Sequence, residues 1–137
     1  MVDTEAAVLW GKLVRLNAAA CTTSATGRPM GWIRPNAEWR GRLEGCVREA
    51  AAVANAEGAQ IRVETVLEQL DRVHGSLSTS MNRDIGAGRL CELDAIPGPV
   101  LRAAERHGLA CPNIVELVAR IRERIATGQC GSSPART

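Results

Sequence analysis

Apolar residues recur along this chain at the spacing of three to four residues that places them on one side of an α-helix. Over residues 36–57 they form a single stripe, which predicts a long helix with one buried face. An earlier helix is expected to run to Thr26 from Asp3 or Thr4, either of which is suited to cap it. The stripe of the long helix consists of Trp39, Leu43, Cys46, Val47, Ala50 and Ala54.

Shorter periodic segments follow the two long ones. A helix is expected over 63–74, where Gly75 would end it, and short helical segments are expected over 30–34 and 80–87. The inward positions of the 63–74 helix are Val63, Val66, Leu67 and Leu70. No segment indicates a strand, so the fold class predicted from the pattern is all-α.

Two more helices are expected in the last third of the chain. Pro97 and Pro99 fit only the first turn of a helix over 93–107, so this helix is expected to begin late or to kink. Asn113 is suited to cap a final helix that runs to about Thr127. Residues 128–137 are rich in Gly, Ser and Pro and are expected to form a loose tail after a domain over 1–127.

Composition narrows the class of protein. The chain has 137 residues, of which 45% are apolar and 23% charged, enough for one domain with a real core. Phe and Tyr are absent, so the core must be built from Leu, Val, Ile and Ala. This length excludes an enzyme that carries both a full nucleotide-binding domain and a substrate domain.

Charge and terminal sequence argue against several partners. Acidic residues are interleaved with basic ones at a net charge of +2, so we expect no nucleic-acid partner. The acidic N-terminus is unlike a signal peptide, and the apolar runs are too short to span a membrane. The chain is therefore expected to be soluble and cytoplasmic. The run with arginine at 120, 122 and 124 is interpreted as the solvated face of the last helix.

The five cysteines are widely spaced and show no C-x-x-C pair. A disulfide framework or a structural zinc site requires tighter, paired spacing. We therefore expect reduced cysteines that act as small apolar residues, and no metal site.

Lys12 is the only lysine among 17 basic residues. On a helix its neighbours are apolar except for one, so its ammonium would be desolvated and suited to exchange a proton near neutral pH. The alternative is a lysine whose stem covers the core while its head reaches water. The residue pattern leaves both open. The apolar neighbours are Val8, Leu9, Leu16, Ala19 and Ala20.

Other polar residues have structural interpretations that compete with functional ones. Ser80 and its neighbours are suited to cap a short helix or to bind a carboxylate, and capping is favoured. Glu92 stands where a loop meets a helix, and its role stays open. His74 and His107 each precede a glycine at a predicted helix end, where a cation stabilises the helix.

Four segments together resemble one family. They are Leu9–Val14, Thr26–Gly31, Ser80–Ile96 and Arg106–Pro112, in family order and with family-like spacing. They are similar to the C-terminal helical domain of ketopantoate reductases (2-dehydropantoate 2-reductases), and the S-M-x-x-D-x-x-x-G-R-x-x-E-x-D stretch is the most specific. The resemblance implies the all-α helical bundle of 6-phosphogluconate-dehydrogenase-like reductases, the domain that binds substrate and forms dimers.

The resemblance also implies a reaction and site residues. In this family NADPH delivers hydride to a 2-keto acid, and a lysine on the first helix protonates the alkoxide as it forms. Lys12 matches that lysine, which makes it the implied catalytic residue. Ser80 matches the serine that binds the substrate carboxylate, and Glu92 matches the glutamate that lines the site beside the lysine and the cofactor.

Two departures from the family limit what is implied. Where many members carry asparagines four and eight residues after the lysine, this chain has Leu16 and Ala20. Asn17 is a candidate substrate-binding residue, but on a regular helix it points about 100° away from the position next to it. The N-terminal Rossmann domain is missing as well, so this chain alone is not expected to bind NADPH tightly.

Three functions therefore stay open. In the first, the chain is the catalytic domain of a reductase and is completed by a separate Rossmann domain. In the second, it is a stand-alone helical domain. In the second case Lys12 and Glu92 would serve a non-redox acid–base enzyme or bind a small, more hydrophobic molecule. A purely structural dimerisation module is the third reading. A homodimer is expected because a missing partner domain leaves apolar surface exposed.

Overall fold

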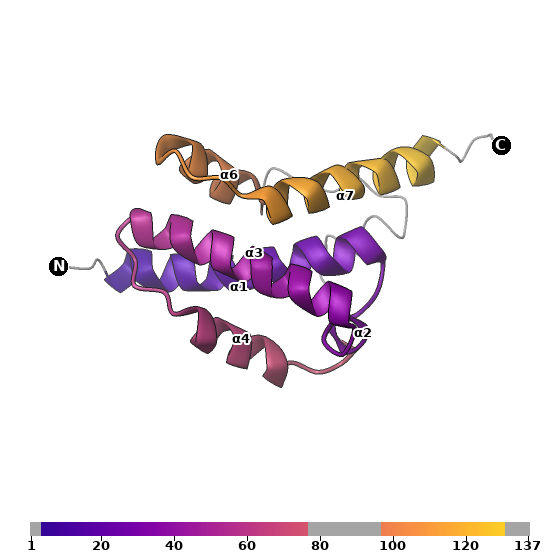
Figure 1. Cartoon of the computed structure of the whole chain (residues 1–137), viewed down its shortest axis with the longest axis horizontal. Helices are drawn as coiled ribbons and strands as arrows, with labels where there is room; N and C mark the ends of the chain where they lie inside the picture. Colours follow the sequence, from indigo (N-terminus) through magenta and orange to yellow (C-terminus); the bar gives the residue numbers. More distant parts are fainter. Residues whose placement is uncertain (1–3, 77–96, 131–137) are drawn as a thin grey trace.

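The computed structural model describes residues 4–76 and 97–130, and every regular element in these two ranges is a helix (Figure 1). The predicted all-α fold is confirmed. The short helix expected over 80–87 lies outside the described residues, as does the stretch before Pro97. The helices are α1 (Thr4–Thr26), α2 (Met30–Ile33), α3 (Ala37–Ala56), α4 (Val63–Arg72), α6 (Pro97–Arg106) and α7 (Pro112–Cys130).

The ends of the two long helices follow local sequence. Helix α1 covers the expected residues, and Gly27 after it has a φ of 72°, in the left-handed region that glycine favours. Helix α3 follows Asn36, whose side-chain oxygen accepts a hydrogen bond of 3.1 Å from the backbone N–H of Trp39. Helix α6 carries both prolines in its first turn, as expected.

Helix α1 lies at the centre of the fold. In Figure 1, α3 runs alongside α1, with α6 and α7 on one side of this pair and α4 on the other. All residues over 17–24 are buried, so the second half of α1 is enclosed all round. Three consecutive alanines in this stretch, residues 18–20, are small enough for neighbouring helices to approach closely. No helix among the described residues is long and apolar enough to cross a membrane.

The N-terminus of α7 is capped from another helix. The Glu49 carboxylate on α3 accepts hydrogen bonds from the backbone N–H groups of Asn113 and Ile114, at 2.9 and 3.0 Å. The Asn113 side chain also donates to Glu49, at 2.8 Å. The prediction that Asn113 caps this helix is therefore wrong, because a distant carboxylate satisfies the free N–H groups and complements the helix dipole. Helix α7 also extends to Cys130, beyond the predicted end at Thr127.

The arginine run of α7 is not simply a solvated face. Arg120 and Arg42 lie over the ring of Trp39, 5.7 and 5.1 Å from its centroid, and Arg120 pairs with Glu116. Arg124 donates a hydrogen bond of 2.8 Å to the backbone oxygen of a residue in α1. Arg120 is exposed, as the solvated-face interpretation expects, but that interpretation is wrong for the half-buried Arg124, which is held against α1.

Arginines also fix α4 to the rest of the fold. Arg34 donates to the backbone oxygens of Leu70 and Val73, at 2.8 and 2.7 Å, which ends α4 sooner than the predicted stop at Gly75. Arg40 on α3 binds the Asp71 carboxylate through two hydrogen bonds, of 2.6 and 3.3 Å. The hydrogen bond from Arg40 lowers the pKa of Asp71 below its usual value.

Two glycines one turn apart on α3 provide a matched test of this packing. A Cβ at Gly45 would lie 2.5 Å from the Asn113 side-chain nitrogen, which is held by Glu49, whereas a Cβ at Gly41 meets nothing within 4 Å. We expect Gly45→Ala to lower the free energy of unfolding by about 1–2 kcal/mol through overpacking. Gly41→Ala is expected to raise it by about 0.5–1 kcal/mol. Urea unfolding followed by circular dichroism measures both, and equal effects would contradict the packing.

The Arg40–Asp71 pair makes the stability of the fold depend on pH. Because the folded-state pKa of Asp71 is depressed, its contribution to stability is present above the unfolded pKa and is lost as pH falls through the folded value. For an exposed pair this contribution is below about 1 kcal/mol. We expect Asp71→Asn to be less stable than the parent at pH 7, and the difference to be smaller at about pH 3, where the contribution of the carboxylate is being lost. Thermal unfolding at both values checks this, and a difference that does not change with pH would contradict it.

Candidate functional site

Lys12 lies on the exposed side of the first half of α1. Its side chain is exposed, and so are those of Val8 (66%), Leu9 (62%) and Leu16 (36%) around it. We call these four residues the Lys12 face. The ammonium is therefore not desolvated within this fold, although its neighbours are apolar as the sequence predicted. Water would leave Lys12 only when another surface covers this face.

The apolar residues of the Lys12 face are unusual for an exposed helix surface. The large apolar side chains of the neighbouring helix α3 are buried, and exposed ones that gather in one place commonly mark a surface that binds something. Ala19 and Ala20, the other two apolar neighbours expected around Lys12, are buried and do not belong to the face. Of the apolar neighbours predicted for Lys12, three therefore lie at the surface beside it and two lie in the core.

Asn17 lies in the core and not beside Lys12. Its side chain is fully buried, and its oxygen accepts a long hydrogen bond of 3.6 Å from the Cys21 thiol. Its amide nitrogen has no hydrogen-bond partner, and the same holds for the hydroxyl of Ser24 two turns further along α1. The structure therefore does not bring Asn17 and Lys12 together, and a substrate-binding role for Asn17 stays a prediction.

The two other predicted site residues, Ser80 and Glu92, lie outside the described residues. Their grouping with Lys12 is therefore a prediction that the structure does not test. The structure does show that Leu16, which replaces one of the family's asparagines, is exposed one turn after Lys12.

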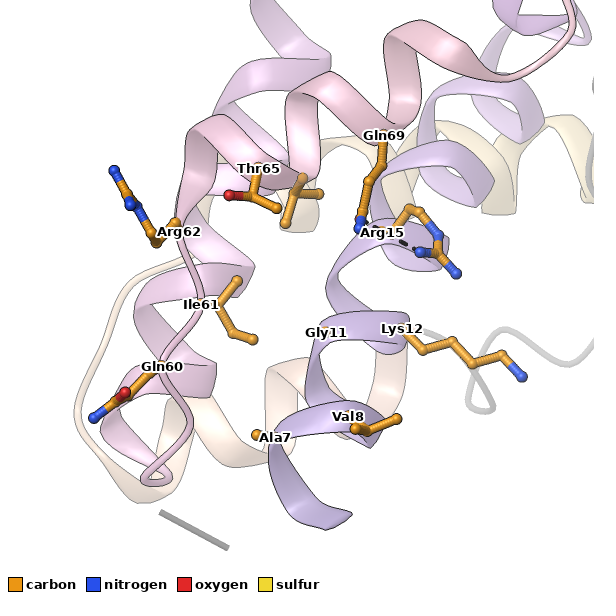
Figure 2. A pocket seen from close by; sticks show the side chains of 11 residues that line it. Ala7, Val8, Gly11, Lys12, Arg15, Gln60, Ile61, Arg62, Thr65 and Gln69 are labelled. Carbon is orange, nitrogen blue, oxygen red and sulfur yellow. Dashed lines mark hydrogen bonds between the residues drawn. The ribbon is translucent and has the colours of Figure 1, made fainter. Parts of the chain in front are cut away.

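A cavity of about 420 Å³ opens beside this part of α1 (Figure 2). It lies between the first half of α1 on one side and α4 with the connection before it on the other. Arg15 donates a hydrogen bond of 3.3 Å to the Gln69 side chain across it. The lining residues are Ala7, Val8, Gly11, Lys12, Arg15, Gln60, Ile61, Arg62, Thr65, Val66 and Gln69.

Sequence reasoning identified only Lys12 among the polar residues of this cavity. In Figure 2 its ammonium points away from the cavity, so Lys12 forms part of the rim and not of the floor. Arg15, Arg62 and Gln69 were missed, since no local pattern shows that α4 packs beside the first half of α1. The periodicity of the 63–74 segment did predict that Val66 faces inward, and it is buried.

Cys21, Cys46 and Cys111 are buried thiols, as expected. Burial raises the pKa of Cys21 to about 12 and that of Cys111 to about 11, and it raises the pKa of Cys46 as well. At neutral pH these thiols are protonated and are poor nucleophiles. Within residues 4–76 and 97–130, no group of three or more His, Cys, Asp or Glu side chains is placed to hold a metal ion.

The sequence matches known proteins over most of its length. The family described as "Ketopantoate reductase PanE/ApbA C terminal" matches residues 5–124. A 2-dehydropantoate 2-reductase of Shigella flexneri is 34% identical over 110 residues, which cover 71% of this chain and 36% of the relative. That of Caulobacter vibrioides is 32% identical over 113 residues, which cover 80% of this chain and 38% of the relative.

Solved structures share the fold. The dimeric ketopantoate reductase of Staphylococcus aureus superposes with a TM-score of 0.81 at 23% identity, covering 93% of this chain and 46% of that one. A D-mandelate dehydrogenase in complex with NADH gives a TM-score of 0.81 at 21% identity, covering 91% of this chain and 44% of that one. At these identities the likeness establishes the fold alone.

The matched region is only part of each relative. The chain spans a little over a third of the length of the curated relatives it matches. The family match over residues 5–124 carries the assignment, and the solved structures share the fold. The chain therefore belongs to the ketopantoate reductase family, as a C-terminal helical domain of that family.

Proposed function

We propose that this chain is the substrate-binding and catalytic domain of an NADPH-dependent 2-keto acid reductase that works with a separate nucleotide-binding domain. The observation that carries the proposal is the Lys12 face, where one exposed ammonium stands among exposed apolar side chains on the first helix of a domain of this family. A second domain that covers this face would remove water from around Lys12. A charged donor acts most strongly on a reacting oxygen in such a site.

The described residues do not fit a nicotinamide cofactor by themselves. Dinucleotides bind where a glycine-rich turn leads from a strand into a helix, and residues 4–76 and 97–130 contain no strand. When bound to the nucleotide-binding domain, NADPH would supply the hydride. The proposed contribution of this chain is to hold the substrate and to supply the proton.

Lys12 is suited to the proton-transfer role. A keto oxygen that gains negative charge during reduction is stabilised by a nearby ammonium, which donates its N–H and then the proton itself. Arginine does not give up its proton in proteins, so the other basic residues of the chain are unsuited to this step. Ser80 is proposed to bind the substrate carboxylate, and Glu92 to hold the Lys12 ammonium beside the cofactor.

The apolar character of the Lys12 face favours certain substrates. Val8 and Leu16 flank Lys12 one turn before and one turn after it, and both are exposed. A 2-keto acid with an apolar side group would bury these residues, whereas the hydroxyl of ketopantoate would find no partner in their side chains. The proposed substrate class is therefore 2-keto acids with apolar side groups.

A fusion protein tests the proposed reaction. The nucleotide-binding domain of the Caulobacter vibrioides relative is joined to the N-terminus of this chain, and NADPH oxidation is measured with phenylglyoxylate and with ketopantoate. We expect turnover with a preference for phenylglyoxylate. Lys12→Ala and Lys12→Arg are each expected to lower kcat by about 10²-fold or more, since neither supplies the proton.

A control and a contrary result complete this test. Arg48→Ala removes an exposed cation from α3 and is expected to leave kcat unchanged. A kcat that is insensitive to Lys12→Ala would refute the proton-transfer role. Conversion of a substrate by this chain without NADPH would instead favour the stand-alone acid–base enzyme, in which Lys12 works with Glu92.

The same face leads us to infer self-association when the chain is alone. Exposed apolar side chains gain stability when a second copy covers them, and closed dimers are the commonest outcome. The Staphylococcus aureus relative is dimeric. We expect light scattering to show a dimer of this chain at micromolar concentration, and Leu9→Glu to shift it toward monomer. A parent chain that is monomeric under these conditions would contradict the inference.

A further inference from the structure

The cavity between α1 and α4 combines an apolar floor with a basic rim. Its floor is formed by Gly11 of α1, by Ile61 of the connection and by Val66 of α4, whose side chain is buried. A Cβ built at Gly11 would lie 3.7 Å from the Ile61 side chain, so any larger side chain at this position would fill the cavity. The glycine therefore keeps the space open.

The cations around the cavity lack the carboxylate partners that other arginines have. Arg40, Arg42 and Arg106 each form an ion pair with a carboxylate from another helix or helix end. Within the described ranges, by contrast, no ion pair involves Arg15 or Arg62, and Arg15 has only the neutral Gln69 as a hydrogen-bond partner. Among the described residues, no carboxylate pairs with the positive charge at this cavity.

None of the described residues that line the cavity is acidic. In Figure 2, Arg15 reaches toward Gln69 at one end of the cavity, and Arg62 extends outward from the opposite rim. Arg62 is exposed and adds positive charge to this rim without reaching into the cavity. A guanidinium can bind a carboxylate through two parallel N–H groups.

We propose that this cavity binds a small organic anion, with an apolar body against Gly11, Ile61 and Val66 and its acid group on Arg15. The volume of about 420 Å³ falls within the range of small-molecule sites. The site differs from the one proposed for reduction, because the Lys12 ammonium points away from this cavity. Binding here requires neither NADPH nor a nucleotide-binding domain.

The test uses octanoate as a carboxylate with an apolar body. Amide signals of the full ¹⁵N-labelled chain are followed by NMR during titration with octanoate, 1-octanol and acetate. We expect octanoate to shift the signals of Gly11, Ile61 and Thr65 in a saturable way. 1-Octanol lacks the carboxylate and acetate lacks the apolar body, so each is expected to bind at least about tenfold more weakly than octanoate.

Two variants examine the two halves of the site separately. Arg15→Gln is expected to weaken octanoate about tenfold while leaving 1-octanol unchanged, because only the charge-assisted contact is lost. Gly11→Leu is expected to abolish binding of both by filling the cavity. Gly41→Leu and Arg48→Gln are the matched controls on α3, and both are expected to bind octanoate like the parent chain.

Several outcomes would overturn the proposal. These are shifts confined to the Lys12 face or to other surfaces, equal affinity for octanoate and 1-octanol, or an octanoate affinity that Arg15→Gln does not change. The charge-loss variant keeps the test decisive even if Gly11→Leu fails to fold. Because the measurement involves no turnover, its result is independent of whether the proposed reductase activity is found.

Discussion

The enclosure of α1 by α3 and α7 is the constraint on which the rest of the structure depends. Residues 17–24 of α1 are buried on every side, and alanines in this stretch let the neighbouring helices approach closely. A helix whose second half is fixed in this way cannot rotate, so the directions of its first-half side chains are fixed as well. The position of Lys12 at the surface follows from packing more than a turn away.

The first half of α1 carries two different surfaces because its neighbours cover it unevenly. Helix α4 and the connection before it stand beside one side and leave the cavity, while the Lys12 face is left without cover in the described fold. The arginines that bind α4 and α7 to the fold are held by carboxylates, carbonyls or the Trp39 ring. Arg15 at the cavity rim has, among the described residues, only the neutral Gln69 as a partner, which leaves its charge available to an anion from outside.

The sequence by itself determined the class of fold and most helix boundaries. Helical spacing of small and aliphatic residues, together with Asn36 before α3 and Gly27 after α1, acts locally and is therefore readable without tertiary knowledge. The unusual position of the single lysine and the family motifs around it also lie in local sequence. Of the four predicted site residues, Lys12 and Asn17 fall within the described residues, and only Lys12 lies at the surface.

Other features of the protein depend on contacts between segments that are far apart in the sequence, and only the tertiary structure decided them. The cap of α7 comes from Glu49, which is 64 positions away from Asn113. The sequence around Asn113 contains nothing that predicts so distant a capping residue. The burial of Asn17, the exposure of Lys12 among apolar residues, and the cavity that α4 forms beside α1 have the same origin. Helical periodicity states which residues share a face, but only the packing of helices against one another decides whether that face meets the core, a cavity or the solvent.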